Sequence, residues 1–360
     1  MVRIAKVLLL VAPVLFAACA PNENDHEKMV DLRVVKDDPD AQLINLNDAI
    51  ERSKRDGSLY ARRAVILLQK GSLDLALKDA NEAVRLTGSE PSSLFVKAQV
   101  LRATGNRDEA LQLALQAERN SYQSASLYVL LSELYLHKKE YGQALSYLKK
   151  AENLSPADEF VYYYKGRVQE ALGDTTKAIK NYALSLEHSK RFLQAQRELA
   201  GLYVAMDNFS EAKPYIRSAL KTGVKDAKLW YNMGLIYQSE QKSDSAFKAF
   251  KNAESINDTL PEVNYKLGVL YHGQGNNDEA LVHLDKAYAA FKSKPEYLGK
   301  LASAYERAGL YSKALATYQL LVEVEPRATY AYQAIARLKY KISKPIPDSA
   351  AVRLQEQIER

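Results

Sequence analysis

Cysteine is nearly absent from this chain, and that absence is the first of several that limit its chemistry. The 360 residues include one cysteine, Cys19, so no disulfide can form within the chain and no thiolate cluster can hold a metal. Only 11 prolines and 15 glycines interrupt the sequence. A composition rich in Ala, Leu, Lys, Glu and Tyr therefore favours regular elements over long irregular loops.

Catalytic motifs are absent as well. No two of the five histidines stand at the i,i+4 spacing of a metalloprotease helix. The turn from Gly273 to Asp278 begins like a dinucleotide-binding loop, but Asp278 stands where the third glycine is needed. No Gly-x-Ser-x-Gly segment occurs. We therefore expect no catalytic residues, no metal site and no cofactor, and the chain is not predicted to be an enzyme.

The only long apolar run lies at the N-terminus, from Val7 to Phe16, and two basic residues precede it. This pattern over residues 1–18 is typical of an exported protein's signal peptide. One interpretation is an ordinary signal cut after an Ala-x-Ala site. The run from Leu15 to Cys19 also resembles a bacterial lipoprotein signal, with Phe16 in the place of the usual Leu. We favour the lipoprotein interpretation because the chain's only cysteine stands at the expected place.

The lipoprotein resemblance implies that Cys19 is the mature N-terminus and carries acyl chains such as palmitate, enough for stable anchoring. Residues 19–37 are then a polar tether. Ala20 after the cysteine favours the outer membrane by the sorting rule known for enteric lipoproteins, and we expect the periplasmic face of the cell envelope. The acidic residues Glu23, Asp25 and Glu27 also permit a surface-export interpretation.

Charge gives no strong indication of a partner. The formal net charge is +6, and the basic residues are dispersed rather than gathered in a basic and aromatic stripe. An exported protein rarely meets nucleic acid, so we expect no nucleic-acid partner.

The remainder of the chain repeats with a period of 34 residues. The stretch from Ala125 to Pro156 reads as two amphipathic helices joined by a polar turn. Stepping by 34 residues from Ala144 meets alanine in every copy, and the Ser132 column holds only Ala, Ser or Gly. Small residues there let the two helices approach closely. A column of tyrosines at the Tyr135 position is expected to fill the space between successive hairpins.

This pattern resembles the tetratricopeptide repeat family. The signature is fullest in one copy, which carries the residues Trp230, Met233, Gly234, Tyr237, Ala246, Phe250 and Ala253. The family's proline near the end of the unit survives only as Pro156 and Pro326. The resemblance implies an all-α fold, a right-handed superhelical solenoid of helix-turn-helix repeats with terminal capping helices.

We expect one elongated solenoid over residues 38–342. It comprises a half-repeat at 38–56, eight full repeats over 57–328 and a capping helix at 329–342. Glycines such as Gly71 and Gly105 mark the turn inside several repeats, where positive φ is useful. In the fourth repeat, Lys165, Gln169 and Ser185 occupy columns that are usually apolar. Residues 343–360 form a tail with a short helix, which is expected to fold back on the solenoid or to serve as a partner helix.

In the resembled family, partners bind the inner face formed by the first helices of the repeats. Carried onto this chain, the predicted groove residues are Phe160, Tyr163, Tyr164, Arg167, Arg197, Tyr231, Asn232, Tyr265 and Lys266. Tyr and Arg are frequent anchors of interfaces. The alternative is that some of these side chains only pack the helices together. Some members of the family bind the C-terminal carboxylate of a peptide with a set of basic and Asn residues. This chain matches that set only in part, because Gly201 and Glu262 stand where the set requires other residues.

The sequence therefore predicts a membrane-anchored scaffold that holds protein or peptide segments in its groove. By resemblance, such lipoproteins serve pilus or secretion machinery, outer-membrane assembly or cell-wall hydrolases. The alternative function is an envelope receptor that stacks a glycan or small ligand on the tyrosines. The oligomeric state stays open.

Overall fold

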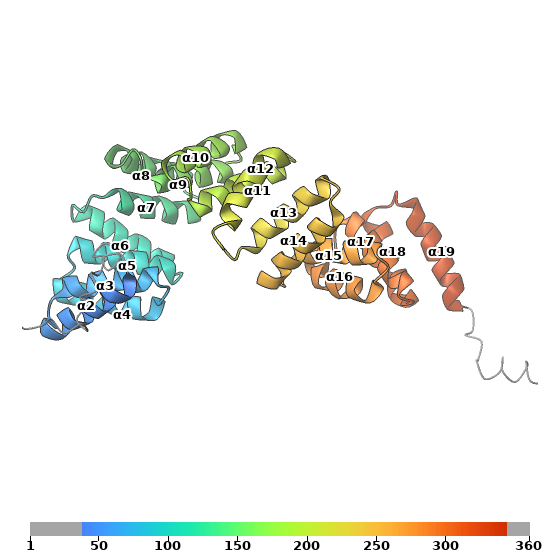
Figure 1. Ribbon diagram of the computed structural model, residues 1–360, viewed down its shortest axis with the longest axis horizontal. Helices are drawn as coiled ribbons and strands as arrows, with labels where there is room; N and C mark the ends of the chain where they lie inside the picture. Colours follow the sequence, from blue (N-terminus) through green and yellow to red (C-terminus); the bar gives the residue numbers. More distant parts are fainter. Residues whose placement is uncertain (1–37, 344–360) are drawn as a thin grey trace, which may run out of the picture. The chain divides into compact units, whose positions relative to one another are not determined.

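The computed structural model describes residues 38–343, and the chain is helical there except for the connections between helices (Figure 1). This described part contains 18 helices and no strand. The expected all-α fold is therefore confirmed for these residues. The signal segment, Cys19, the tether and residues 344–360 of the tail lie outside the described residues.

The chain divides into two compact units, the first ending at Tyr122 and the second beginning at Gln123. In the first unit a single helix precedes two helix hairpins. Its helices are α2 (Pro39–Arg52), α3 (Gly57–Gln69), α4 (Leu73–Thr87), α5 (Pro91–Ala103) and α6 (Arg107–Arg119). Helix α2 occupies the predicted half-repeat, and each hairpin matches one predicted repeat.

The second unit contains six hairpins followed by a single last helix. Its helices are α7 (Ala125–His137), α8 (Tyr141–Leu154), α9 (Glu159–Ala171), α10 (Thr175–His188), α11 (Leu193–Ala205), α12 (Phe209–Leu220), α13 (Ala227–Ser239), α14 (Ser243–Ile256), α15 (Pro261–Gly273), α16 (Asn277–Phe291), α17 (Pro295–Arg307), α18 (Tyr311–Val324) and α19 (Thr329–Ser343). One continuous solenoid over residues 38–342 stays a prediction, because each unit is described by itself. The small residues that recur every 34 positions lie where the two helices of each hairpin meet. They recur in the same way on both sides of the division.

The turn inside each hairpin has the same backbone conformation in all eight repeats. Five repeats place a glycine there, and these glycines have φ between 75° and 90°. The other three repeats adopt positive φ with Lys139, Asp207 and Gln241, at 61°, 56° and 58°. The predicted use of glycine is confirmed. The three other side chains show that the hairpin geometry imposes the left-handed conformation even where it is strained.

The seam between the two helices of a hairpin is closed by the predicted small residues. Every member of the Ala144 column is completely buried, at 0% exposure. The Ser132 column holds glycine in three repeats, and in each of them a large side chain faces the glycine. A Cβ on Gly166, Gly234 or Gly268 would lie 2.4 to 2.7 Å from the side chain of Tyr182, Phe250 or Leu284. At these three positions glycine leaves the space that the facing side chain occupies.

The tyrosine column packs both within and between hairpins. Tyr135 stacks on Tyr147 of its own hairpin, with ring centroids 5.6 Å apart. Tyr271 on α15 meets Phe247 of the preceding hairpin edge-on, at 5.4 Å. The expected role between hairpins is therefore confirmed for Tyr271.

The fourth repeat closes normally despite its polar residues. The Ser185 hydroxyl donates to the carbonyl oxygen of Glu159 at 2.9 Å, and Lys165 forms an ion pair with Glu152 at 2.7 Å. Each polar side chain therefore has a partner that its apolar counterpart would not need.

Candidate functional site

The predicted groove residues all lie on first helices of the second unit, namely α9, α11, α13 and α15. Aspartates set where two of these helices begin. Asp158 accepts a hydrogen bond from the backbone N–H of Phe160 at 2.8 Å. Asp226 accepts from Lys228 and Leu229 at 2.9 and 3.1 Å. These N-caps fix the start of α9 and α13 and hence which side chains share a face.

Tyr163 is enclosed by other aromatic side chains and is only 6% exposed. Its ring meets Phe192 edge-on at 5.4 Å and lies 5.9 Å from the ring of Tyr182. Arg167 donates to the Tyr163 hydroxyl at 3.1 Å. Burial opposes the charge of Arg167, but this hydrogen bond and nearby Glu198 outweigh it and raise its pKa. This pair packs the helices together and offers no open ring face.

Arg197 is already neutralised by acidic neighbours. One terminal nitrogen lies 2.9 Å from a carboxylate oxygen of Glu198, and the other lies 3.7 Å from Asp226. Asp226 therefore caps α13 and also ties it to α11. Arg197 is half-buried, so its first role in this structure is to hold two neighbouring first helices together.

Tyr231 and Tyr265 are half-buried and lean on aromatic side chains of their own hairpins. The ring of Tyr231 lies 5.8 Å from that of Phe250, and the ring of Tyr265 lies 5.2 Å from that of Phe291. Burial, followed by the charge of Glu262, raises the pKa of Tyr231 to about 12. Both tyrosines therefore stay neutral at physiological pH and present part of an apolar ring.

Asn232 and Lys266 follow these tyrosines at the same offset in consecutive repeats. Asn232 is 4% exposed, and within residues 38–343 its amide nitrogen has no hydrogen-bond partner. Lys266 is half-buried and makes no hydrogen bond or ion pair with another described residue. Burial lowers the pKa of Lys266, and the charge of Glu296 opposes that shift. The buried amide N–H of Asn232 without an acceptor is costly, and carbonyl or carboxylate oxygens are the groups that would satisfy it and pair with Lys266.

The structure thus separates the predicted site residues into two sets. Tyr163, Arg167 and Arg197 have partners within the chain. Asn232 and Lys266 keep unused hydrogen-bonding capacity, with Tyr231 and Tyr265 beside them in the sequence. Nothing in the sequence distinguishes these sets, because whether a polar side chain finds a partner depends on residues from several helices.

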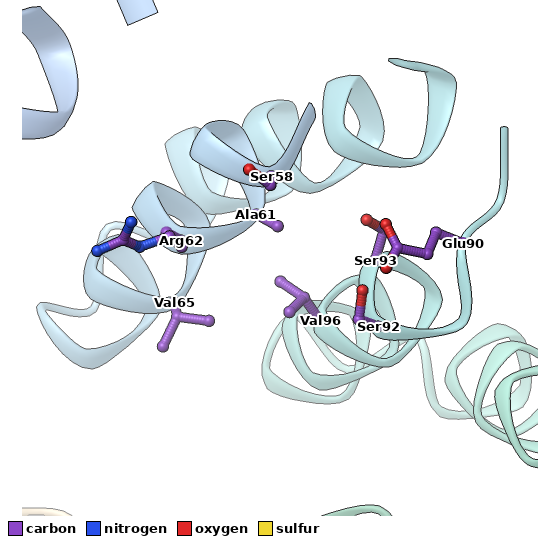
Figure 2. Close-up of a pocket in the computed structure, with 8 residues that line it drawn as sticks. All are labelled: Ser58, Ala61, Arg62, Val65, Glu90, Ser92, Ser93 and Val96. Atoms are coloured by element: carbon purple, nitrogen blue, oxygen red, sulfur yellow. The ribbon is translucent and has the colours of Figure 1, made fainter. Parts of the chain in front are cut away.

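The prediction missed a second set of inner-face residues on the first helices of the first unit. Arg62, Ser92 and Val96 stand at offsets that line the inner face, and they border a notch between α3 and α5 (Figure 2). The offset rule applied to the first two repeats would have found them.

Two further findings concern the described residues only. No cluster of three or more His, Cys, Asp or Glu side chains suited to a metal occurs in residues 38–343. No helix in that range is long and apolar enough to cross a membrane.

Sequence profiles described as tetratricopeptide repeat match residues 95–159, 227–259 and 271–338. Among curated proteins, the chain is 27% identical to the human protein O-mannosyl-transferase TMTC1 over 180 residues, which is 47% of this chain and 20% of that protein. The chain thus spans a small part of that relative.

Among solved structures, the hetero-tetramer Cut9-Hcn1 of the APC/C superposes with a TM-score of 0.59 at 15% identity, over 83% of this chain and 58% of the other. PilF of Pseudomonas aeruginosa gives a TM-score of 0.53 at 17% identity, over 61% of this chain and 97% of the other. These likenesses concern the fold.

Proposed function

Since the chain carries tetratricopeptide repeats, which in general mediate protein–protein interactions, we propose that it is a membrane-anchored, non-enzymatic adaptor. Its second unit binds a segment of a partner protein along the first helices. The partner acts in cell-envelope assembly or secretion, and nucleic acid is not a partner.

The observation that carries this proposal is the pair of unused donors, Asn232 and Lys266. A buried amide N–H without an acceptor, as in Asn232, costs about 1–3 kcal/mol. A main-chain carbonyl, an acidic side chain or a C-terminal carboxylate of a bound segment would supply oxygens to both. The half-buried rings of Tyr231 and Tyr265 would flank that segment with apolar surface.

The glycan receptor is the weaker alternative. Stacking on a sugar requires an open ring face, and Tyr163, one of the three tyrosines proposed for it, is enclosed by aromatic side chains. Arg167 and Arg197 are also poor probes of a ligand, because replacing them would break contacts within the protein. Lys266 and Asn232 are cleaner probes, since their side chains have no partner to lose among the described residues.

The binding test uses a fluorescent library of short acidic peptides with free C-termini, a C-terminally amidated copy of it, and maltoheptaose as a neutral sugar. We expect the acidic peptides to bind the full chain. Lys266→Met and Asn232→Leu should each weaken binding about ten- to a hundredfold, as expected for a lost hydrogen bond to a charged group. Lys248→Met, an exposed lysine on α14, is the control and should bind like the parent. Equal binding by all variants, or binding of the sugar alone, would contradict the proposal.

Anchoring is tested separately at Cys19, which lies outside the described residues. The proposal expects that Cys19→Ser abolishes incorporation of labelled palmitate and releases the chain from the membrane fraction. Unchanged labelling in Cys19→Ser would remove the lipid anchor from the account and leave the groove untouched.

A further inference from the structure

Helix α19 packs against the rest of the second unit on one side only. Its buried residues Ala331 and Leu338 belong to the core that also holds buried residues of α17 and α18. Figure 1 shows α19 beside α18 as the last helix of the described chain. A stripe on another side of α19 is exposed, with Tyr332 at 50%. This open face consists of Tyr332, Ala336 and Lys339, which follow one another at helical spacing.

The open face occupies positions that are covered in every full repeat. Ala336 continues the Ser132 column, and the members of that column in the eight repeats are all buried. Tyr332 and Lys339 continue the columns of Tyr128 and Tyr135, whose members in the eight repeats are all buried or half-buried. Exposure at these positions therefore distinguishes α19 from the first helices of the repeats.

In the repeats, the second helix of the same hairpin covers these positions. A Cβ on Gly234 would lie 2.4 Å from the Phe250 ring. The rings of Tyr135 and Tyr128 lie 5.6 and 6.0 Å from that of Tyr147 on α8. No second helix follows α19 within the described residues. The open face is therefore the side of α19 on which such a helix would pack.

The chemistry of the open face also suits a covering helix. The terminal element of a repeat array normally presents a polar outer face, which keeps the array soluble. Here the face combines a tyrosine ring with an alanine, and Lys339 is its only charged member. The small side chain of Ala336 leaves room for a large one opposite it, as Gly234 does for Phe250.

The sequence after α19 supplies the residues of such a helix. Helix α19 has 15 residues, whereas each first helix of the eight repeats has 13. The sequence that follows α19 is therefore displaced by two positions from the 34-residue period. With this displacement, Ala350 and Leu354 stand in the columns of Ala144 and Leu148. Pro347 stands where the second helix would begin, and proline suits a first helical turn.

The second helices of the repeats have 12 to 15 residues, and residues 347–360 suffice for one. We propose that residues 347–360, which lie outside the described residues, dock on the open face of α19 and close a ninth hairpin. Leu354 then faces Ala336 as Phe250 faces Gly234. A second copy of the chain is the rival occupant. The short connection after α19 holds residues 347–360 at an effective concentration in the millimolar range, so a second copy at micromolar concentration competes poorly. The proposal does not depend on the donors Asn232 and Lys266.

Disulfide trapping in the full chain tests this docking. Cys19→Ser first removes the only natural thiol. Ala336→Cys is then combined with Leu354→Cys or, as a control, with Glu356→Cys, because position 356 lies on the opposite side of a helix from position 354. A disulfide requires Cα atoms within about 7 Å. We therefore expect the 336–354 pair to form a disulfide within one chain, about tenfold or more faster than the 336–356 pair.

Hydrogen exchange tests the same contact without engineered cysteines. Leu354→Asp combined with Ile358→Asp removes two apolar side chains from the proposed contact, so the amides of α19 should exchange about tenfold or more faster than in the parent. Val352→Asp, on the opposite side of the same segment, should leave them unchanged, and α13 serves as the internal reference in every variant. The proposal is overturned if the 336–354 disulfide joins two chains, if both cysteine pairs oxidise equally, or if exchange of α19 is unchanged in the double variant.

Discussion

Replacing Gly234 by alanine should destabilise the second unit even though alanine is the better helix former. A Cβ at position 234 would lie 2.4 Å from Cε1 of Phe250, and Phe250 is completely buried. The ring therefore has no free space to move into. Overpacking of this kind costs about 1–3 kcal/mol, against a gain in helix propensity of about 1 kcal/mol.

Gly201 provides a matched control on the first helix of the preceding repeat. A Cβ there meets no heavy atom within 4 Å, so Gly201→Ala should raise the free energy of unfolding by about 0.5–1 kcal/mol. The same substitution is thus expected to have opposite effects at the two positions, with a difference of about 1–3 kcal/mol.

Trp230, the only tryptophan of the chain, lies on the same helix as Gly234 and reports this unfolding by its fluorescence in urea. Adding Phe250→Ile to Gly234→Ala should recover most of the loss, because it recreates the pair that Ala200 and Ile216 form in the preceding repeat, both at 0% exposure. Equal shifts for the two glycine variants, or no recovery in the double variant, would refute the packing argument.

Three further predictions concern stability. Lys139→Gly should raise the unfolding free energy by about 0.5–1 kcal/mol, because glycine adopts the positive φ of that turn without strain; urea unfolding measures it, and a loss of stability would contradict it. Asp79→Ala should cost about 2–4 kcal/mol, because it leaves the partly buried Arg63 without its bidentate partner; thermal denaturation followed by circular dichroism measures it, and a change below about 0.5 kcal/mol, as at ordinary surface positions, would show the pair to be dispensable. Burial lowers the pKa of His272 and His283, so below about pH 6.5 the unfolded chain binds more protons than the folded chain and the free energy of unfolding should fall. Denaturation midpoints at neutral and mildly acidic pH measure this effect. A midpoint that rises on acidification would contradict the prediction.

The hairpins were predictable because the signals that form them are local. Small residues at Ala144 and its counterparts close each seam, and Gly71 and its counterparts form the turns. The positive φ of Lys139 was not predictable from residue type, since a lysine alone does not favour it. It follows only from the hairpin geometry that the other repeats share.

The candidate site was predictable in position but not in the state of its side chains. The family offsets placed Tyr163 and Lys266 on the same inner face. The structure buries Tyr163 among aromatic residues of α9, of α10 and of the connection before α11, and it leaves Lys266 half-buried and unpaired. Whether a side chain is buried or paired depends on residues far apart in the sequence. The repeat pattern gives the position of a residue on its helix and not these distant neighbours. The notch at Arg62 was missed because the offsets were applied to only four of the repeats.

The most direct test of the central proposal, that the groove of the second unit holds a partner protein, is site-specific photo-crosslinking in intact membranes. A photo-reactive residue replaces Tyr231 in the groove, and a second variant carries it at Val282, an exposed position on α16. We predict that one protein is captured at position 231 and not at position 282, and that Lys266→Met abolishes the capture. Equal capture at both positions, or capture that persists in Lys266→Met, would contradict the proposal.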